Sequence, residues 1–161
     1  MKIASLSDIK KELSHLNEKE LKDLIIDLSK FSTENKAYLF FKLFERDNPR
    51  LFVEMVKEDL DFEFVKANTK HYHFAKKSAQ SIRRKLNKFL KLTKDKTAQI
   101  ELILFFCEKM KLYGYLTFRH PVIENLYITQ IRKSEKLISG LHEDLQYDYQ
   151  YQIEELKNIK N

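Results

Sequence analysis

Glycine and proline are so scarce in this chain that most folds built on tight turns are excluded. The chain has 161 residues, with two glycines, Gly114 and Gly140, and two prolines, Pro49 and Pro121. Antiparallel sheets need such residues at their hairpin turns and strand ends. Lys, Glu, Leu and Ile dominate instead, as helical proteins prefer. The sequence therefore predicts an all-α fold, organised as a single domain over residues 1–161.

Apolar residues recur at helical spacing and predict about seven helices. Asn17, with a glutamate three residues later, indicates one helix start, and the Asn48-Pro49 pair indicates another. Gly114 is typical of a helix end, and Pro121 of a helix start. Short connections favour a helical bundle or a short stack of antiparallel helix hairpins. The expected helices cover residues 7–15, 17–31, 33–44, 49–66, 70–92, 95–113 and 121–156.

The last of these elements is expected to be one long C-terminal helix. Its apolar stripe keeps the same phase across Gly140, which favours a continuous helix, bent at the glycine, over two helices and a loop. On such a helix Gly140, Asp144, Tyr147 and Tyr151 share the outer face. Exposed tyrosines beside a glycine form a candidate self-association surface. The alternative is that these tyrosines cover a loop of their own chain.

Segment 95–113 is apolar on almost every side and is expected at the centre of the fold. At least one of Phe105 and Phe106 should be fully buried. Cys107, the one cysteine, is expected to be a buried, inert thiol, which suits a reducing compartment. The longest apolar run, LILFFC, is too short to span a bilayer, and the first residues contain no apolar signal segment. We therefore expect a cytoplasmic protein with no membrane partner.

Positive charge is concentrated in one segment. The chain has a net charge of +6, and residues 70–96 contain ten basic side chains and one acidic side chain. A lysine and arginine face of this kind can contact phosphates or an acidic protein partner. It can equally be solvated, or paired with the acidic residues of Glu54–Glu63 in the preceding helix. The candidate residues for polyanion or partner contact are Lys76, Lys77, Arg83, Arg84, Lys88 and Lys91.

The sequence lacks the patterns of common catalytic and cofactor sites. The two glycines lie far apart, so no glycine-rich phosphate loop can form. His71 and His73 are two residues apart and point to different faces of a helix, and His142-Glu143 lacks the second histidine of a zinc-binding helix. We therefore predict no catalytic, cofactor-binding or metal-binding residues, and a protein that is not an enzyme.

Two functions remain as predictions. The first is a non-catalytic module that binds an unknown protein partner or its own copy. The second is a weak, sequence-independent nucleic-acid binder that uses residues 70–96. The scarcity of arginine, six residues against 24 lysines, argues against specific base recognition.

Two stretches carry a resemblance to a known family. They are LKDLIIDLSKFSTENKAYLFFKLFE, from Leu21 to Glu45, and ISGLHEDLQYDYQYQIEEL, from Ile138 to Leu156. Together they resemble an uncharacterised family of small helical proteins from Bacteroidetes, a domain of unknown function. The resemblance implies an all-helical bacterial protein of the cytoplasm. It implies no activity, ligand or site residue.

Overall fold

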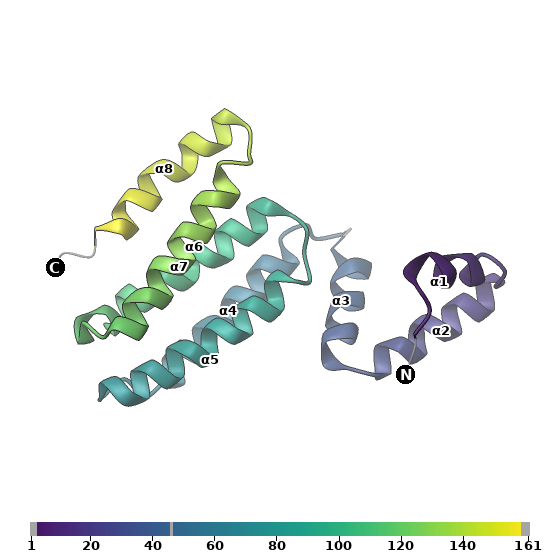
Figure 1. The fold of residues 1–161 in the computed structure, drawn as a ribbon, viewed down its shortest axis with the longest axis horizontal. Helices are drawn as coiled ribbons and strands as arrows, with labels where there is room; N and C mark the ends of the chain where they lie inside the picture. Colours follow the sequence, from purple (N-terminus) through teal and green to yellow (C-terminus); the bar gives the residue numbers. More distant parts are fainter. Residues whose placement is uncertain (1–2, 46, 159–161) are drawn as a thin grey trace. The chain divides into compact units, whose positions relative to one another are not determined.

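Helices account for all the regular secondary structure in the part of the chain that the structure describes. The computed structural model describes residues 3–45 and 47–158, which contain eight α-helices and one short 3-10 helix and no strand (Figure 1). The predicted all-α fold is confirmed: the described residues form eight α-helices, where the sequence predicted about seven helices. The chain divides into an N-terminal unit, up to residue 46, and a C-terminal unit, from residue 47. The single domain over residues 1–161 stays a prediction.

The N-terminal unit consists of α1 (Leu6–Leu13), α2 (Glu18–Lys30) and α3 (Thr33–Phe44). A side-chain cap begins each helix. The side chain of Asn17 accepts a hydrogen bond from the backbone N–H of Glu20, and Glu20 accepts one from the backbone N–H of Asn17. This confirms the predicted capping box. Helices α2 and α3 pack against each other.

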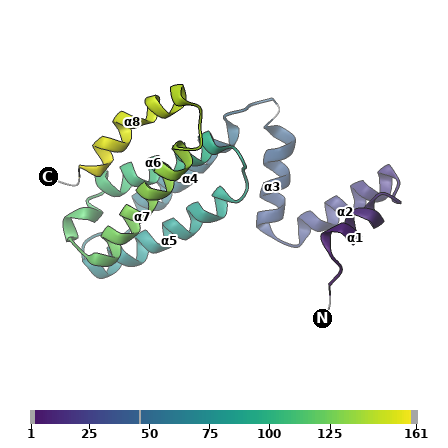
Figure 2. The same ribbon diagram turned by 45° about the horizontal axis from the view of Figure 1, so that its top comes forward.

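The C-terminal unit is built around α6. Its elements are α4 (Leu51–Lys66), α5 (Tyr72–Leu90), α6 (Lys96–Leu112), the 3-10 helix η1 (Tyr115–Phe118), α7 (Pro121–Ile138) and α8 (Glu143–Lys157). Helix α6 packs against α4, α5, α7 and α8. Figure 2 shows it between these neighbours. Ile103, Phe106 and Cys107 on α6 have no exposed surface. The predicted central position of this helix is confirmed.

Gly114 ends α6 as predicted. Tyr113 is the C-cap residue of α6. Gly114 follows with a φ of 71°, in the left-handed conformation that favours glycine. The 3-10 helix η1 begins directly after it, and Tyr115 in this turn is fully buried. The hydroxyl groups of Tyr115 and Ser78 lie 3.0 Å apart, so this turn is fixed against α5.

The predicted long C-terminal helix is wrong. Helix α7 ends at Ile138 and α8 begins at Glu143, and the two helices pack against each other as a hairpin (Figure 1). An apolar stripe keeps its phase in one long helix and also in two helices that face the same core, so the stripe could not distinguish them. The connection is held by polar contacts: Lys96 donates to the carbonyl oxygen of Gly140, and Gln146 to that of Leu141.

We expect Phe106 to contribute far more to stability than its neighbour Phe105. Phe106 is fully buried, whereas Phe105 is half-buried under the ammonium groups of Lys57 and Lys109. Phe106→Ala should lower the free energy of unfolding by about 3–5 kcal/mol, because it leaves a cavity in a closed core. Phe105→Ala is the matched control and should cost clearly less. Urea denaturation measures both, and equal losses would contradict the central position of Phe106.

Candidate functional site

The basic residues of α5 lie on a helix that contains no acidic residue. One face of α5 is buried in the core, so its basic side chains lie on the other faces. The buried residues are Ala75, Ala79, Ile82, Leu86 and Leu90. Six lysines and arginines and no aspartate or glutamate occur between Tyr72 and Leu90. Lys76 and Arg83 are half-buried, and the exposed members of the predicted set are Lys77, Arg84, Lys88 and Lys91.

The acidic residues of α4 pair with this helix mainly through one lysine outside the predicted set. Lys85 lies 2.7 Å from Asp59 and 3.0 Å from Glu63. Asp61 pairs instead with Lys109 on α6. Within residues 3–45 and 47–158, no ion pair involves Lys76, Lys77, Arg83, Arg84 or Lys91. The internal pairing that the sequence left open thus holds for Lys85, and among the described residues these five cations have no acidic partner.

Arg83 faces a second cation on α7. Burial lowers the pKa of Lys133, and the nearby charge of Arg83 lowers this pKa further. The acidic residue two positions along α7, Glu135, lies 2.5 Å from Lys157 of α8. Lys76 lies two helical turns before Arg83 on the same side of α5. The side of α5 that faces α7 is therefore basic, and Lys85 marks the other side.

A hollow of about 570 Å³ lies at the ends of α5 and α7. Its polar lining includes Lys70, His71 and Arg119. Tyr72 stacks on His120 in this hollow, with ring centroids 5.3 Å apart and an angle of 15° between the planes. Arg119 adopts a φ of 47°, which is uncommon outside glycine. Sequence reasoning missed this group, although the letters HYHF directly before the basic residues carry the signal.

The predicted self-association residues are only partly brought together. Tyr147 and Tyr151 lie one turn apart on α8 and are 79% and 71% exposed. The hydroxyl of Tyr151 donates to Glu155. Asp144 is exposed in the first turn of the same helix, next to His142. Gly140 is not on this helix, because it lies in the connection before α8. The glycine therefore drops out of the predicted face, and the role of the tyrosines stays a prediction.

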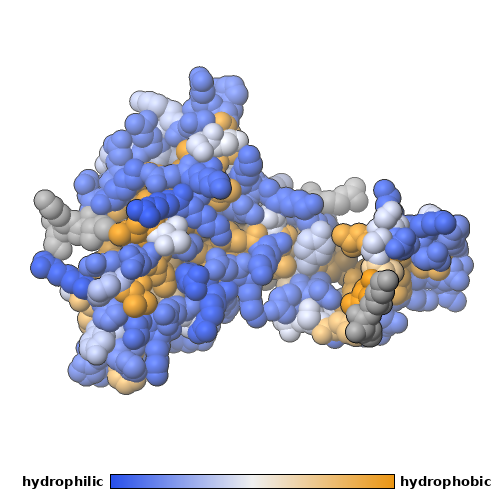
Figure 3. Space-filling model, in the orientation of Figure 1, coloured by the Kyte–Doolittle hydropathy of each residue, from blue (hydrophilic) through white to orange (hydrophobic). Residues whose placement is uncertain are grey.

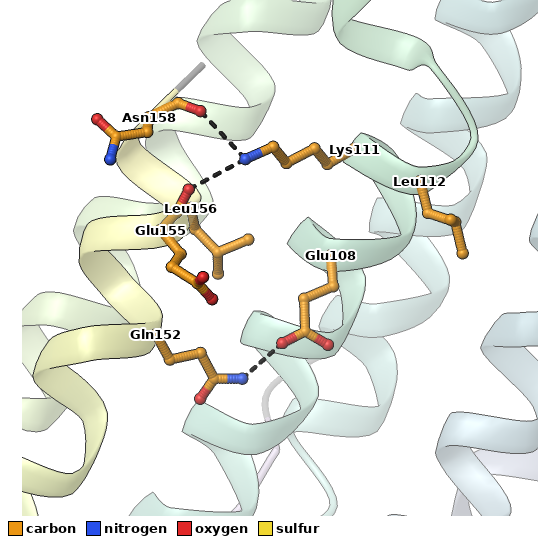
Figure 4. A pocket seen from close by; sticks show the side chains of 7 residues that line it. All are labelled: Glu108, Lys111, Leu112, Gln152, Glu155, Leu156 and Asn158. Atoms are coloured by element: carbon orange, nitrogen blue, oxygen red, sulfur yellow. Dashed lines mark hydrogen bonds between the residues drawn. The ribbon is translucent and has the colours of Figure 1, made fainter. Parts of the chain in front are cut away.

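A second hollow, of about 500 Å³, lies between α6 and α8 (Figure 4). Lys111 donates from Nζ to the carbonyl oxygens of Glu155 and Asn158, each at 3.1 Å. Gln152 donates to Glu108 at 2.5 Å. These polar groups satisfy one another and fasten the end of α8 to α6. The hollow is therefore a packing seam, whose lining is already engaged.

Apolar side chains of the N-terminal unit are exposed in unusual number. Helices α1 and α2 contain no buried residue, and α3 contains one, Phe41. Figure 3 shows apolar side chains gathered on the visible face of this unit. The exposed large apolar residues between positions 3 and 45 are Ile3, Leu6, Ile9, Leu24, Ile25, Ile26, Leu28, Phe31, Tyr38, Phe40, Leu43 and Phe44.

Cys107 and the potential metal ligands were the remaining residues with possible chemistry. Burial raises the pKa of the Cys107 thiol, and the charge of Glu108 raises it further, so this thiol stays protonated. Across the described ranges, no three His, Cys, Asp or Glu side chains are grouped so that they could hold a metal ion. In the same ranges no helix is both long and apolar enough to cross a membrane.

Comparisons with protein-family models, with curated proteins and with solved structures find no match to this chain. The resemblance to the Bacteroidetes family therefore stays a prediction.

We expect Lys85 to stabilise the fold and its exposed neighbour Lys77 not to. The hydrogen bond from Lys66 lowers the pKa of Glu63 from its ordinary value of 4.5 by more than burial raises it, and the hydrogen bond and charge of Lys85 lower it further. A lowered pKa means that the stabilisation is present above that value and is lost as the pH falls through the folded-state pKa. Lys85→Ala should cost about 1 kcal/mol at neutral pH.

The control variant Lys77→Ala should leave the free energy of unfolding unchanged within the error of urea denaturation. The difference between Lys85→Ala and the wild type should shrink as the pH falls below 4.5 and through the lowered folded-state pKa of Glu63, because Glu63 then loses its charge. A difference that stays constant from neutral to acidic pH would contradict this account of Lys85.

Proposed function

We propose that this protein is a non-catalytic interaction module that associates with a second copy of itself through its N-terminal unit. The observation that carries the proposal is the exposure of apolar side chains on α1, α2 and α3. On α2 the stripe of Leu24, Ile25 and Leu28 is 47%, 44% and 57% exposed, and Phe31 at the end of this helix is 83% exposed. Such a stripe normally faces a core.

The size of the unit explains why it needs a partner surface. A segment shorter than about 60 residues buries too little of its own surface to be more than marginally stable. Full burial of one Leu, Ile or Phe side chain contributes about 1.5–3 kcal/mol. The unit exposes 12 large apolar side chains, so a surface that covers even a few of them is strongly favoured.

The charges of the unit favour a second copy as the occupant. Residues 3–45 contain seven lysines and eight aspartates or glutamates, so two copies do not repel each other. The two signs alternate along α2, where Lys22 pairs with Glu18 and Lys30 pairs with Asp27. A strongly acidic or basic partner would gain no electrostatic attraction from the nearly neutral surface of this unit. Two-fold pairing places the same apolar patch on both sides of the contact, which is the commonest arrangement of homodimers.

Two observations support the non-catalytic part of the proposal. The Cys107 thiol is buried in α6 and kept protonated, so it is a poor nucleophile. The carboxylates of Asp59, Asp61 and Glu63 are each held by a lysine. A free, buried cysteine is also common in reducing compartments, which supports a cytoplasmic location as part of the same proposal.

We expect the wild-type protein to sediment as a dimer and Leu28→Lys to sediment as a monomer. The substitution removes one apolar contact from each copy and places two charges in the contact, so the dissociation constant should rise about 100-fold or more. Analytical ultracentrifugation over a wide range of concentrations measures this, and circular dichroism shows that the helices are retained.

Two control variants separate this surface from others. Leu112→Lys on α6 changes a leucine that is 72% exposed in the C-terminal unit and should leave the dimer intact. Tyr147→Ala with Tyr151→Ala tests the predicted tyrosine contact on α8 and should also leave it intact. A wild-type monomer at every concentration, or a dimer that only the tyrosine variant weakens, would sink the proposal.

A further inference from the structure

The basic surface of α5 continues into the aromatic group at the ends of α5 and α7. Residues 67–85 and 109–123, which contain this end of both helices, include no aspartate or glutamate. The first acidic residue that follows is Glu124, one turn into α7. Lys70 and Arg119 line the hollow, and Lys76 and Lys77 follow on the next turn of α5. The two segments that form this end of the unit therefore supply cations and no carboxylate.

Five rings form a connected cluster in the same place. Tyr72 stacks on His120 and meets the edge of His73, at a centroid distance of 6.3 Å. Phe74 contacts the rings of His73 and His71 at 6.1 and 6.4 Å. Tyr72 and Phe74 are 53% and 46% exposed. Aromatic rings with this exposure are not core residues.

We propose that the cluster of His71, Tyr72, His73, Phe74 and His120, with Lys70, Lys76, Lys77 and Arg119 around it, binds single-stranded nucleic acid. The rings offer stacking faces to the bases, and the cations neutralise the phosphates of the same strand. Tyr72 already stacks on His120 and is still half exposed, so a base can extend this stack. The binding is independent of sequence, because every base has an aromatic face.

The rings favour a single strand over the other polyanions. In a duplex the bases stack on one another and their faces are closed, so exposed rings add nothing to duplex binding. An acidic polypeptide can meet the cations, but its carboxylates gain nothing from flat aromatic faces. The row of basic side chains also extends along α5. Lys76 and Arg83 lie seven residues apart on one side of the helix, a spacing of about 10 Å along the axis, and Arg83 faces Lys133.

Fluorescence anisotropy with labelled oligothymidylate and oligouridylate tests the inference on the full chain. We expect the single strands to bind more tightly than a duplex of equal length. Tyr72→Ala should weaken single-strand binding roughly 5- to 150-fold, the range expected for one lost stacking contact, and Tyr72→Phe should restore it. Lys70→Ala with Arg119→Ala should reduce the salt dependence, with a log–log slope smaller by about 1.4 for two lost phosphate contacts.

Tyr147→Ala on α8 is the matched control, since that tyrosine is 79% exposed and lies outside the cluster. It should leave the affinity unchanged. Polyglutamate and heparin serve as competitors without bases and should displace the strand poorly. Equal affinity for single strand and duplex, competition by polyglutamate at equal charge, or full binding by Tyr72→Ala would each overturn the inference. Because the cluster and the N-terminal unit share no residue, the dimer test and this test fail separately.

Discussion

The burial of α6 on every side is the constraint on which the C-terminal unit depends. Four helices pack against it, so each of them must turn one apolar face inward and its charges outward. Glu101 is a charged residue on this central helix, and its carboxylate is partly buried. Burial raises the pKa of Glu101, but hydrogen bonds from Arg50 and Lys57 outweigh this effect and hold the pKa below its ordinary value. The carboxylate is tolerated on the central helix because two cations from the α4 side, each 2.7 Å away, satisfy it.

The same constraint sorts the charges of α5 into two groups. The face of Ala75, Ala79 and Leu86 is fixed toward the core, so the residues on either side of it must face different neighbours. Lys85 is directed to α4 and meets acids there. Arg83 lies on the other side, where its charge lowers the pKa of Lys133 of α7 after the larger effect of burial. Within the described residues Arg83 has no acidic partner, whereas Asp59 and Glu63 satisfy the charge of Lys85.

The structure could be predicted from the sequence where a local pattern is compatible with one conformation only. The capping box at Asn17, the left-handed glycine at Gly114 and the all-round apolar α6 each require one structure, and each was predicted. The structure could not be predicted where a sequence pattern is compatible with two arrangements. The stripe across Gly140 fits one helix or a hairpin, and helical spacing does not reveal that Tyr72 and Phe74 stay about half exposed in the first turn of α5. The stripes of α1 and α2 predict a buried face but not what buries it.

The two proposed surfaces rest on different physics, which decides how they would act together. Association through exposed leucines and phenylalanines is apolar and is strengthened by salting-out salts. Contact with phosphates weakens steeply as salt rises, because counterions are no longer released at a gain. The two surfaces lie on different units of the chain and share no residue. A dimer held by the first surface would carry two ring clusters, and a strand long enough to reach both would bind with an avidity that neither cluster has alone. Each cluster can therefore be weak, as a lysine-rich surface with few arginines is expected to be, and still hold a long strand.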